Sequence, residues 1–207
     1  MTPDAQRAMR AFVASQKTAH GYMNAGGCED AYYGQFGHVL QAVFSPVRLL
    51  TTGIHLSVPE SRKQDTVYGR FFAFLEQEMK SGTPLRDKSF CTLPTSLSDS
   101  TTNAVCCVLA MQHQMGMQSD VTYVKWLRQR QDESGGFRAS EEAPIPDLLS
   151  TAVALFTLRL LGATVRDAMP FVQAHWLESG GFAPTLLDDY SDVEYVFYGL
   201  LALGSLE

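Results

Sequence analysis

Two segments in the second half of the chain repeat each other at a fixed spacing. Ser134–Phe137 reads Ser-Gly-Gly-Phe, and the same four letters recur at Ser179–Phe182, 45 residues later (179 − 134). An aspartate follows each phenylalanine by ten residues, at Asp147 and Asp192, so the match runs without a gap. Self-similarity with a period of roughly 20–50 residues is typical of arrays in which each unit is one supersecondary structure. The chain is therefore predicted to be a repeat array.

Earlier copies of the unit are degenerate. The pattern Asp-x-x-Tyr-x-x-(Phe/Tyr) marks three of the expected unit starts, and a weaker copy lies within Thr101–Gln112. The three are Asp30/Tyr33/Phe36, Asp65/Tyr68/Phe71 and Asp192/Tyr195/Tyr198. With Asp147 included, unit starts fall near 30, 65, 101, 147 and 192, which makes about five units.

Each unit reads as two helices of different character. The helix before the Gly-Gly pair is amphipathic: in 121–132, Val124 and Leu127 form an apolar stripe, while Arg128 and Arg130 are expected to face away from it. The helix after the aspartate is apolar on nearly every side and must be buried all round. Alternation of the two kinds predicts an outer and an inner layer of helices, and strands are disfavoured because period-two alternation is absent.

The connections carry helix-boundary chemistry. The Gly-Gly pair is expected to end each outer helix, because glycine tolerates the left-handed cap conformation. Asp147 and Asp192 are expected to be N-caps of inner helices at about 148–161 and 193–204, where a carboxylate accepts free backbone N–H groups.

The order Gly-Gly-Phe, then Pro-Asp or Ser-Asp, then an apolar helix resembles the repeat of protein prenyltransferase β subunits and of squalene and terpene cyclases. Ser134–Gly162 and Ser179–Gly204 carry this resemblance. It implies an all-α fold, an α/α toroid or double-layer helical barrel of about five helix pairs, as a single domain over residues 1–207. The barrel could close by packing a first outer helix, near 3–17, against the last inner helix, or be completed by another chain.

The resemblance implies a cavity lined by inner helices. If these helices run parallel, their acidic starts gather at one mouth, with aromatic rings one or two turns further in. Such rings offer apolar surface to an isoprenoid chain, and each ring face can stabilise a carbocation by about 0.5–2 kcal/mol. The alternative is that the rings are ordinary core. The residues expected to bind substrate are Asp30, Tyr33, Phe36, Tyr68, Arg70, Tyr195 and Tyr198.

The start of the last inner helix is the expected catalytic position. In class II terpene cyclases this place holds a D-x-D-D box that protonates an alkene or epoxide, and here it reads Asp192-Val193-Glu194-Tyr195, with two acids of the three. An apolar cavity beside an ionised Asp192 would raise the pKa of Glu194, so Glu194 is predicted to be the acid and Asp192 to orient it. The alternative is that Ser191 and Glu194 form a capping box.

Metal ligands are only partly present. In protein prenyltransferases the matching helix begins D-x-C and binds zinc together with a histidine, whereas Glu194 stands in place of the cysteine here and Tyr33 in place of the histidine. Zinc is therefore not expected and no other cofactor is implied. The adjacent Asp188 and Asp189 are most simply a solvated turn, although two carboxylates could hold Mg²⁺.

Two arginines lie within otherwise apolar inner helices. A buried Arg70 or Arg159 needs a partner, which would be an acid of the mouth or an anion such as a diphosphate.

Charge and apolar runs limit the partners. The formal net charge is −6 with no basic stretch, which disfavours nucleic acid, and no apolar run reaches membrane-spanning length. No secretory signal is visible, so a cytoplasmic protein with reduced cysteines is expected. The partner is expected to be an apolar small molecule. The competing hypothesis is a non-catalytic module that holds a partner protein or a second copy of itself.

Overall fold

A computed structural model describes residues 1–19, 21–23, 26–27, 29–30, 97, 100–114 and 116–207. Within this part the protein is helix-rich, as the sequence predicts. The helices are α1 (Pro3–Ser15), α4 (Thr102–Gln114), α5 (Val121–Gln129), α6 (Leu148–Leu160), α7 (Met169–Ala174) and α8 (Val193–Leu206), and the strands are β1 (Tyr22–Met23) and β2 (Glu29–Asp30).

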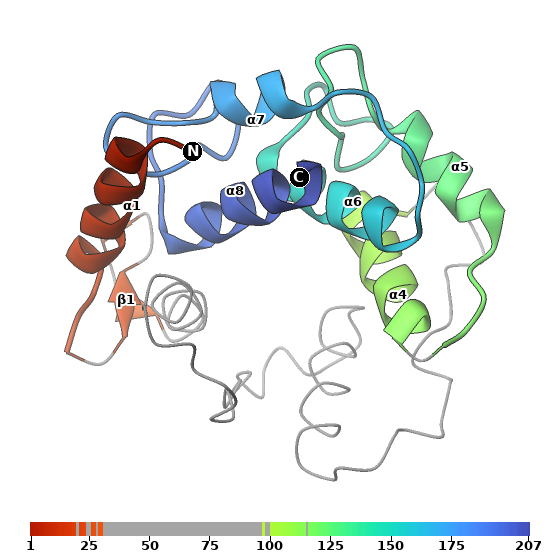
Figure 1. Cartoon of the computed structure of the whole chain (residues 1–207), viewed down its shortest axis with the longest axis horizontal. Coiled ribbons are helices and arrows are strands. Elements are labelled where there is room, and N and C mark those ends of the chain that lie inside the picture. The colour runs from red at the N-terminus through yellow and green to blue at the C-terminus, as the bar shows by residue number, and fades with distance from the viewer. Residues whose placement is uncertain (20, 24–25, 28, 31–96, 98–99, 115) are drawn as a thin grey trace, which may run out of the picture.

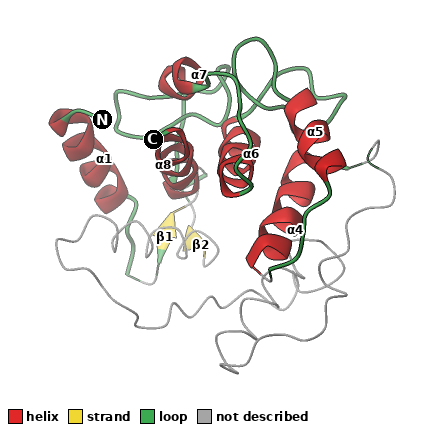
Figure 2. Ribbon diagram, turned by 45° about the vertical axis from the view of Figure 1, so that its right-hand side comes forward, coloured by secondary structure: helices red, strands yellow, loops and turns green. Residues whose placement is uncertain are grey.

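The described helices form two layers. Figure 1 shows α1, α7 and α5 along the outside of an arc, with α8, α6 and α4 on its inner side. Helix α6 packs against both α4 and α8, while α7 and α1 pack against α8; Figure 2 shows the three inner helices side by side. The expected alternation of outer and inner helices is confirmed for these elements.

The inner helices bury most of their apolar side chains, as expected, but α6 is not covered on every side. Phe156 is 37% exposed and Arg159 is exposed as well. The Arg159 guanidinium donates to the carbonyl of Gly204, in the last turn of α8, where helix carbonyls have no partner within the helix. The expectation that Arg159 is buried and pairs with an acid or an anion is therefore wrong, because its long side chain reaches a helix end instead.

The outer helix α5 differs from its predicted pattern at Arg130. Leu127 is fully buried and Trp126 is 8% exposed, so an apolar face exists. Arg130, expected to face away, is only 8% exposed, and its guanidinium lies 4.5 Å from the centre of the Trp126 ring. This prediction is wrong because Arg130 follows Trp126 by four residues and Leu127 by three, and its backbone is still helical, so it lies on the buried face of the helix.

The Gly-Gly pairs belong to hairpins rather than to helix caps, which corrects the sequence expectation. Helix α5 ends at Gln129, and residues 130–138, the first hairpin, then reverse the chain: Arg138 N donates to Arg130 O at 3.1 Å. Gly135, at φ +89°, forms the turn. Gly135 therefore does adopt a left-handed conformation, as the sequence predicts for a helix cap, but it does so in a turn that follows the end of the helix.

The second hairpin, residues 175–183, has the same hydrogen bonds 45 residues later. Ala183 N donates to His175 O at 2.7 Å, and Gly180 has φ +99°. Phe137 and Phe182, which end the two turns, are 0% and 2% exposed. The repeat is therefore a structural repeat as well as a sequence repeat.

A third hairpin, residues 16–23, follows α1. Met23 N donates to Gln16 O at 2.9 Å, and Lys17 pairs with Tyr22, which is fully buried like the two phenylalanines. The sequence pattern did not reveal this copy, because it has a single glycine, Gly21, before its aromatic residue. A glycine followed by an aromatic just after an amphipathic helix was the available signal.

The only ladder among the described residues pairs β1 with β2. It extends a backbone contact that also occurs at the end of the first hairpin. Tyr22 pairs with Asp30, and Phe137 forms the equivalent bridge with Asp147. The sequence disfavours strands, and the two that occur here are two residues long each. Their pairing supports the alignment of Asp30 with Asp147.

The starts of the inner helices lie on one side of the layer. Thr102 N, at the start of α4, donates to Ala139 O at 2.8 Å, and Leu148 N, at the start of α6, donates to Pro184 O at 2.9 Å. Ser191, just before α8, accepts from Phe182 N at 3.0 Å. Each start is thus held by a hairpin or by the residue directly after one, and α4, α6 and α8 run in the same direction.

Helix α1 continues the outer layer beyond α7. A Cβ at Gly135 would lie 2.9 Å from the Cα of Ala168, at the start of α7. A Cβ at Gly180 would lie 2.5 Å from the carbonyl carbon of Ala8 and 3.0 Å from Met9 N, both in α1. The second hairpin therefore packs on α1 as the first packs on α7, which brings the two ends of the chain together.

Candidate functional site

The candidate site is the acidic edge formed by the starts of α6 and α8. Asp147 is the N-cap of α6, accepting from Ser150 N at 2.7 Å, and Asp192 is the N-cap of α8, accepting from Tyr195 N at 3.1 Å. Both predicted caps are confirmed. Burial raises the pKa of both carboxyl groups above the usual range, against the lowering effect of their backbone hydrogen bonds.

Ser191 does not take the role predicted for it in a capping box. Its hydroxyl accepts from Phe182 N and so belongs to the second hairpin, while Asp192 caps α8. The prediction is wrong for Ser191 because the hairpin lies against the helix start, a contact that local sequence does not reveal.

Glu194 is buried in the first turn of α8. It is 8% exposed, and the neighbouring Asp192 is 1% exposed. Tyr195 is half-buried and Tyr198 is 7% exposed, so these four predicted site residues lie together on one helix. Burial first, and then the nearby charges of Glu194 and Asp192, raise the pKa of the Tyr195 phenol, which keeps that ring neutral at physiological pH.

His175 is a site residue that the sequence analysis missed. It is fully buried at the C-cap of α7, its Nδ1 lies 2.9 Å from Phe171 O, and its ring lies 4.4 Å from the Phe171 ring. A carbonyl only accepts, so Nδ1 carries the proton and Nε2 is left as an acceptor without a partner among the described residues. Burial lowers the pKa of His175 below its usual range, although the charges of Asp147 and Asp188 oppose this.

The available sequence signal for His175 was its position in the repeat. It lies 45 residues after Arg130 (175 − 130), so both are hairpin entry residues at the C-cap of an outer helix.

Asp188 closes the loop before α8. Its carboxylate accepts from Thr185 N at 3.0 Å and from the Thr185 hydroxyl at 2.7 Å, while Asp189 is exposed. Among the described residues, no group of three or more His, Cys, Asp or Glu side chains is placed to hold a metal ion.

Of the other predicted site residues, the structure describes only Asp30. Asp30 lies in β2, in register with Tyr22. Tyr33, Phe36, Tyr68 and Arg70 lie outside the described residues.

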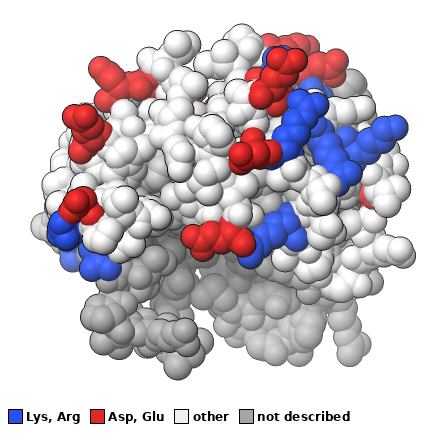
Figure 3. All heavy atoms as spheres, turned by 45° about the horizontal axis from the view of Figure 1, so that its top comes forward, with Lys and Arg blue, Asp and Glu red and all other residues white. Residues whose placement is uncertain are grey.

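The described surface carries charges of both signs. Figure 3 shows Lys and Arg side chains in several places, the largest group at the upper right, with Asp and Glu side chains close to each group. Such mixing avoids a large field of one sign on this face. Among the described helices, none has the length and apolar composition needed to cross a bilayer.

No protein-family model matches the chain, and no curated protein matches it.

Proposed function

We propose that the protein is an isoprenoid-handling enzyme resembling class II terpene cyclases or protein prenyltransferases, with its acidic site at the mouth of an aromatic cavity. The observation that carries the proposal is the burial of Glu194, at 8% exposed, in the first turn of a helix capped by the buried Asp192. A buried acid at this place is suited to general acid chemistry. We also propose that the protein acts in the cytoplasm.

The proposed architecture is an α/α toroid. Two observations support it: the inner helices α4, α6 and α8 run parallel, and α1 packs against α8 and the second hairpin.

In the proposed reaction, the Glu194 carboxyl donates its proton to an alkene carbon or an epoxide oxygen of the substrate. This leaves a carbocation on the substrate and a carboxylate on Glu194. Asp192 orients the helix start through its bond to Tyr195 N, and the neutral ring of Tyr195 and the ring of Tyr198 face the cation. Loss of a proton from the cationic product to solvent or to a nearby base ends the reaction, and proton uptake restores Glu194.

The first test is a native mass spectrum of purified protein for a co-purified apolar ligand and for bound metal. Polyprenyl epoxides and alkenes are then offered as substrates, and products are separated by gas chromatography. Glu194→Gln should lower turnover about 10²-fold or more while substrate binding remains. The matched control is Glu178→Gln, since Glu178 is exposed. Unchanged turnover in Glu194→Gln would remove Glu194 as the acid.

The proposed proton transfer requires no metal. Zinc is not proposed, because Glu194 and Tyr33 replace the cysteine and histidine ligands of the prenyltransferases, and turnover should survive a chelator. Turnover lost on chelation and restored by Mg²⁺ would contradict this and direct attention to Asp188 and Asp189.

A second candidate function is a non-catalytic module that binds a protein. The observation that favours it is the loop before α8, where Leu186 is 55% exposed, Leu187 84% and Tyr190 44%. Apolar side chains exposed together favour a protein contact. Light scattering of wild type and of Leu186→Ser/Leu187→Ser decides whether this loop joins two copies: the variant should shift a dimer to a monomer.

A further inference from the structure

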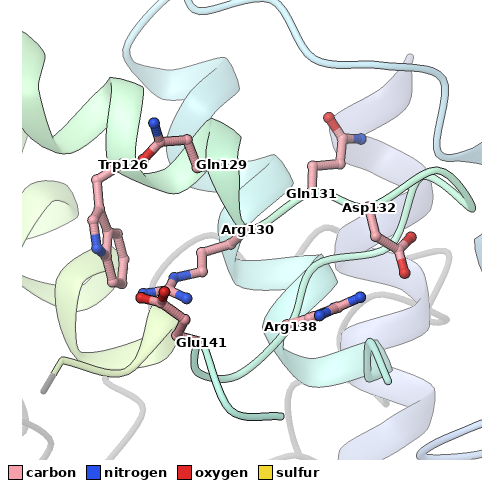
Figure 4. A pocket seen from close by; sticks show the side chains of 7 residues that line it. All are labelled: Trp126, Gln129, Arg130, Gln131, Asp132, Arg138 and Glu141. Atoms are coloured by element: carbon pink, nitrogen blue, oxygen red, sulfur yellow. The ribbon is translucent and has the colours of Figure 1, made fainter. Parts of the chain in front are cut away.

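A pocket of about 420 Å³ lies between the end of α5 and the first hairpin (Figure 4). It is separate from the acidic edge, since none of the four α8 site residues lines it. The lining residues are Trp126, Gln129, Arg130, Gln131, Asp132, Arg138 and Glu141.

Arg130 is a buried cation with few partners. Its side chain is 8% exposed, and among the described residues it forms an ion pair with Glu141 at 3.5 Å, a long contact to a side chain that is 76% exposed. Its Nε is buried without a hydrogen-bond partner among the described residues. A guanidinium has five N–H donors, and burying such a charge is costly unless those donors are used.

Arg138 brings a second guanidinium to the same pocket. It stands opposite Arg130 in the hairpin, joined to it by the 3.1 Å backbone bond, and its Nε is also buried without a partner in the described structure. The hairpin fold does not require this pair of residues, because the second hairpin has His175 and Ala183 at the same two positions. Two arginines in one hairpin therefore point to a ligand rather than to the repeat.

The remaining lining residues define the ligand. Trp126 offers an aromatic ring, against which Arg130 already stacks. Asp132 is engaged within its own turn, where its carboxylate accepts from Ser134 N at 2.8 Å. Figure 4 shows Glu141 beside the Arg130 guanidinium, the place that a ligand carboxylate would take. The two acids in the lining lower the net positive charge, which favours a singly charged anion over a doubly charged phosphate.

We propose that this pocket binds a small organic carboxylate with a flat apolar part. The carboxylate takes the place of Glu141 on the guanidinium of Arg130, and the flat part lies against Trp126. The Arg138 guanidinium, which Figure 4 shows on the Asp132 side of the pocket, adds a second positive charge to the lining. Guanidinium and carboxylate pair in two parallel hydrogen bonds, which gives the site its preference for this group. The inference does not rest on the proposed enzymatic function.

The test uses benzoate as the probe and the full-length chain carrying Trp176→Phe. The chain has two tryptophans, so Trp126 is then the only one that reports. Benzoate should change Trp126 fluorescence saturably. By calorimetry, Arg130→Met should weaken binding at least 10-fold, and Glu141→Gln should tighten it severalfold, because a competing carboxylate is gone. Lys125→Met, at an exposed position of the same helix, is the charge-matched control.

Three results would overturn the proposal. One is the absence of a saturable response to benzoate; another is equal weakening by Lys125→Met and Arg130→Met, which would show a general charge effect. The third is inorganic phosphate binding as tightly as benzoate. If Arg130→Met does not fold by circular dichroism, Arg138→Met takes its place, since Arg138 is only half-buried, and a smaller loss in the same direction is expected; unchanged binding would then overturn the proposal.

Discussion

Replacing Gly180 with alanine tests the contact that brings the two ends of the chain together. Gly180 has φ +99°, and a Cβ there would overlap the backbone of α1 at Ala8. Holding a non-glycine residue in a left-handed conformation costs about 1–2 kcal/mol. Overpacking against backbone, which cannot rotate away, adds about 1–3 kcal/mol. The free energy of unfolding should therefore fall by about 2–5 kcal/mol.

Gly162→Ala is the matched control. Gly162 follows α6 with φ +67°, but a Cβ there would have nothing within 4 Å, so only the conformational cost of about 1–2 kcal/mol applies. Urea unfolding at 25 °C, with a slope of about 2 kcal/mol per M, should place the Gly180→Ala midpoint about 0.5–1.5 M below that of the control. Gly135→Ala should behave like Gly180→Ala, because its Cβ would meet Ala168. Equal midpoints for Gly180→Ala and Gly162→Ala would refute the packing of the second hairpin on α1.

Three further predictions concern buried polar groups. Gln131→Ala removes hydrogen bonds to Gly135 O (2.9 Å) and to Arg166 O and N (3.0 and 2.9 Å). The free energy of unfolding should therefore fall by about 2–3 kcal/mol. In the same urea titration, the control Gln129→Ala, at an exposed position, should change it by less than about 0.5 kcal/mol. Because burial raises the pKa of Asp192 in the folded state, the unfolded chain loses that proton first as the pH rises. The contribution of Asp192 to the free energy of unfolding is therefore complete below about pH 3.8 and declines as the pH rises through the raised pKa. Asp192→Asn should flatten this decline in urea midpoints measured from pH 3 to 8. Because burial lowers the pKa of His175, the unfolded chain takes up that proton first as the pH falls. The contribution of His175 to the free energy of unfolding is therefore complete above about pH 6.5 and declines below it. If the urea midpoint of His175→Asn fell as steeply below pH 6.5 as that of the wild type, this reasoning would be contradicted.

Sequence reasoning succeeded where the deciding interactions lie within one segment. The N-caps Asp147 and Asp192 were predictable because a cap bonds to a backbone N–H three residues away. The bounds of α6 and α8 followed from the apolar runs after those caps. Glu194, Tyr195 and Tyr198 were grouped correctly because they share a helix.

Sequence reasoning failed where the deciding contact crosses between segments. The role of Ser191 depended on the hairpin at Phe182 packing against its helix start. His175 carried no pattern of its own, and its burial follows from the packing of α7 against the inner layer. Arg130 was assigned to solvent from its charge, although it lies on the same helix face as the buried Trp126 and Leu127.

The repeat of 45 residues, the alternation of amphipathic and apolar helices, and the capping aspartates are determined by the sequence itself, because periodicity and short-range hydrogen bonds belong to single segments. The shared direction of α4, α6 and α8 and the place of α1 after α7 were decided only by the tertiary structure. The first depends on hydrogen bonds between helix starts and distant loops. The second depends on backbone approaching backbone at Gly135 and Gly180, where the absence of a side chain is what permits the contact.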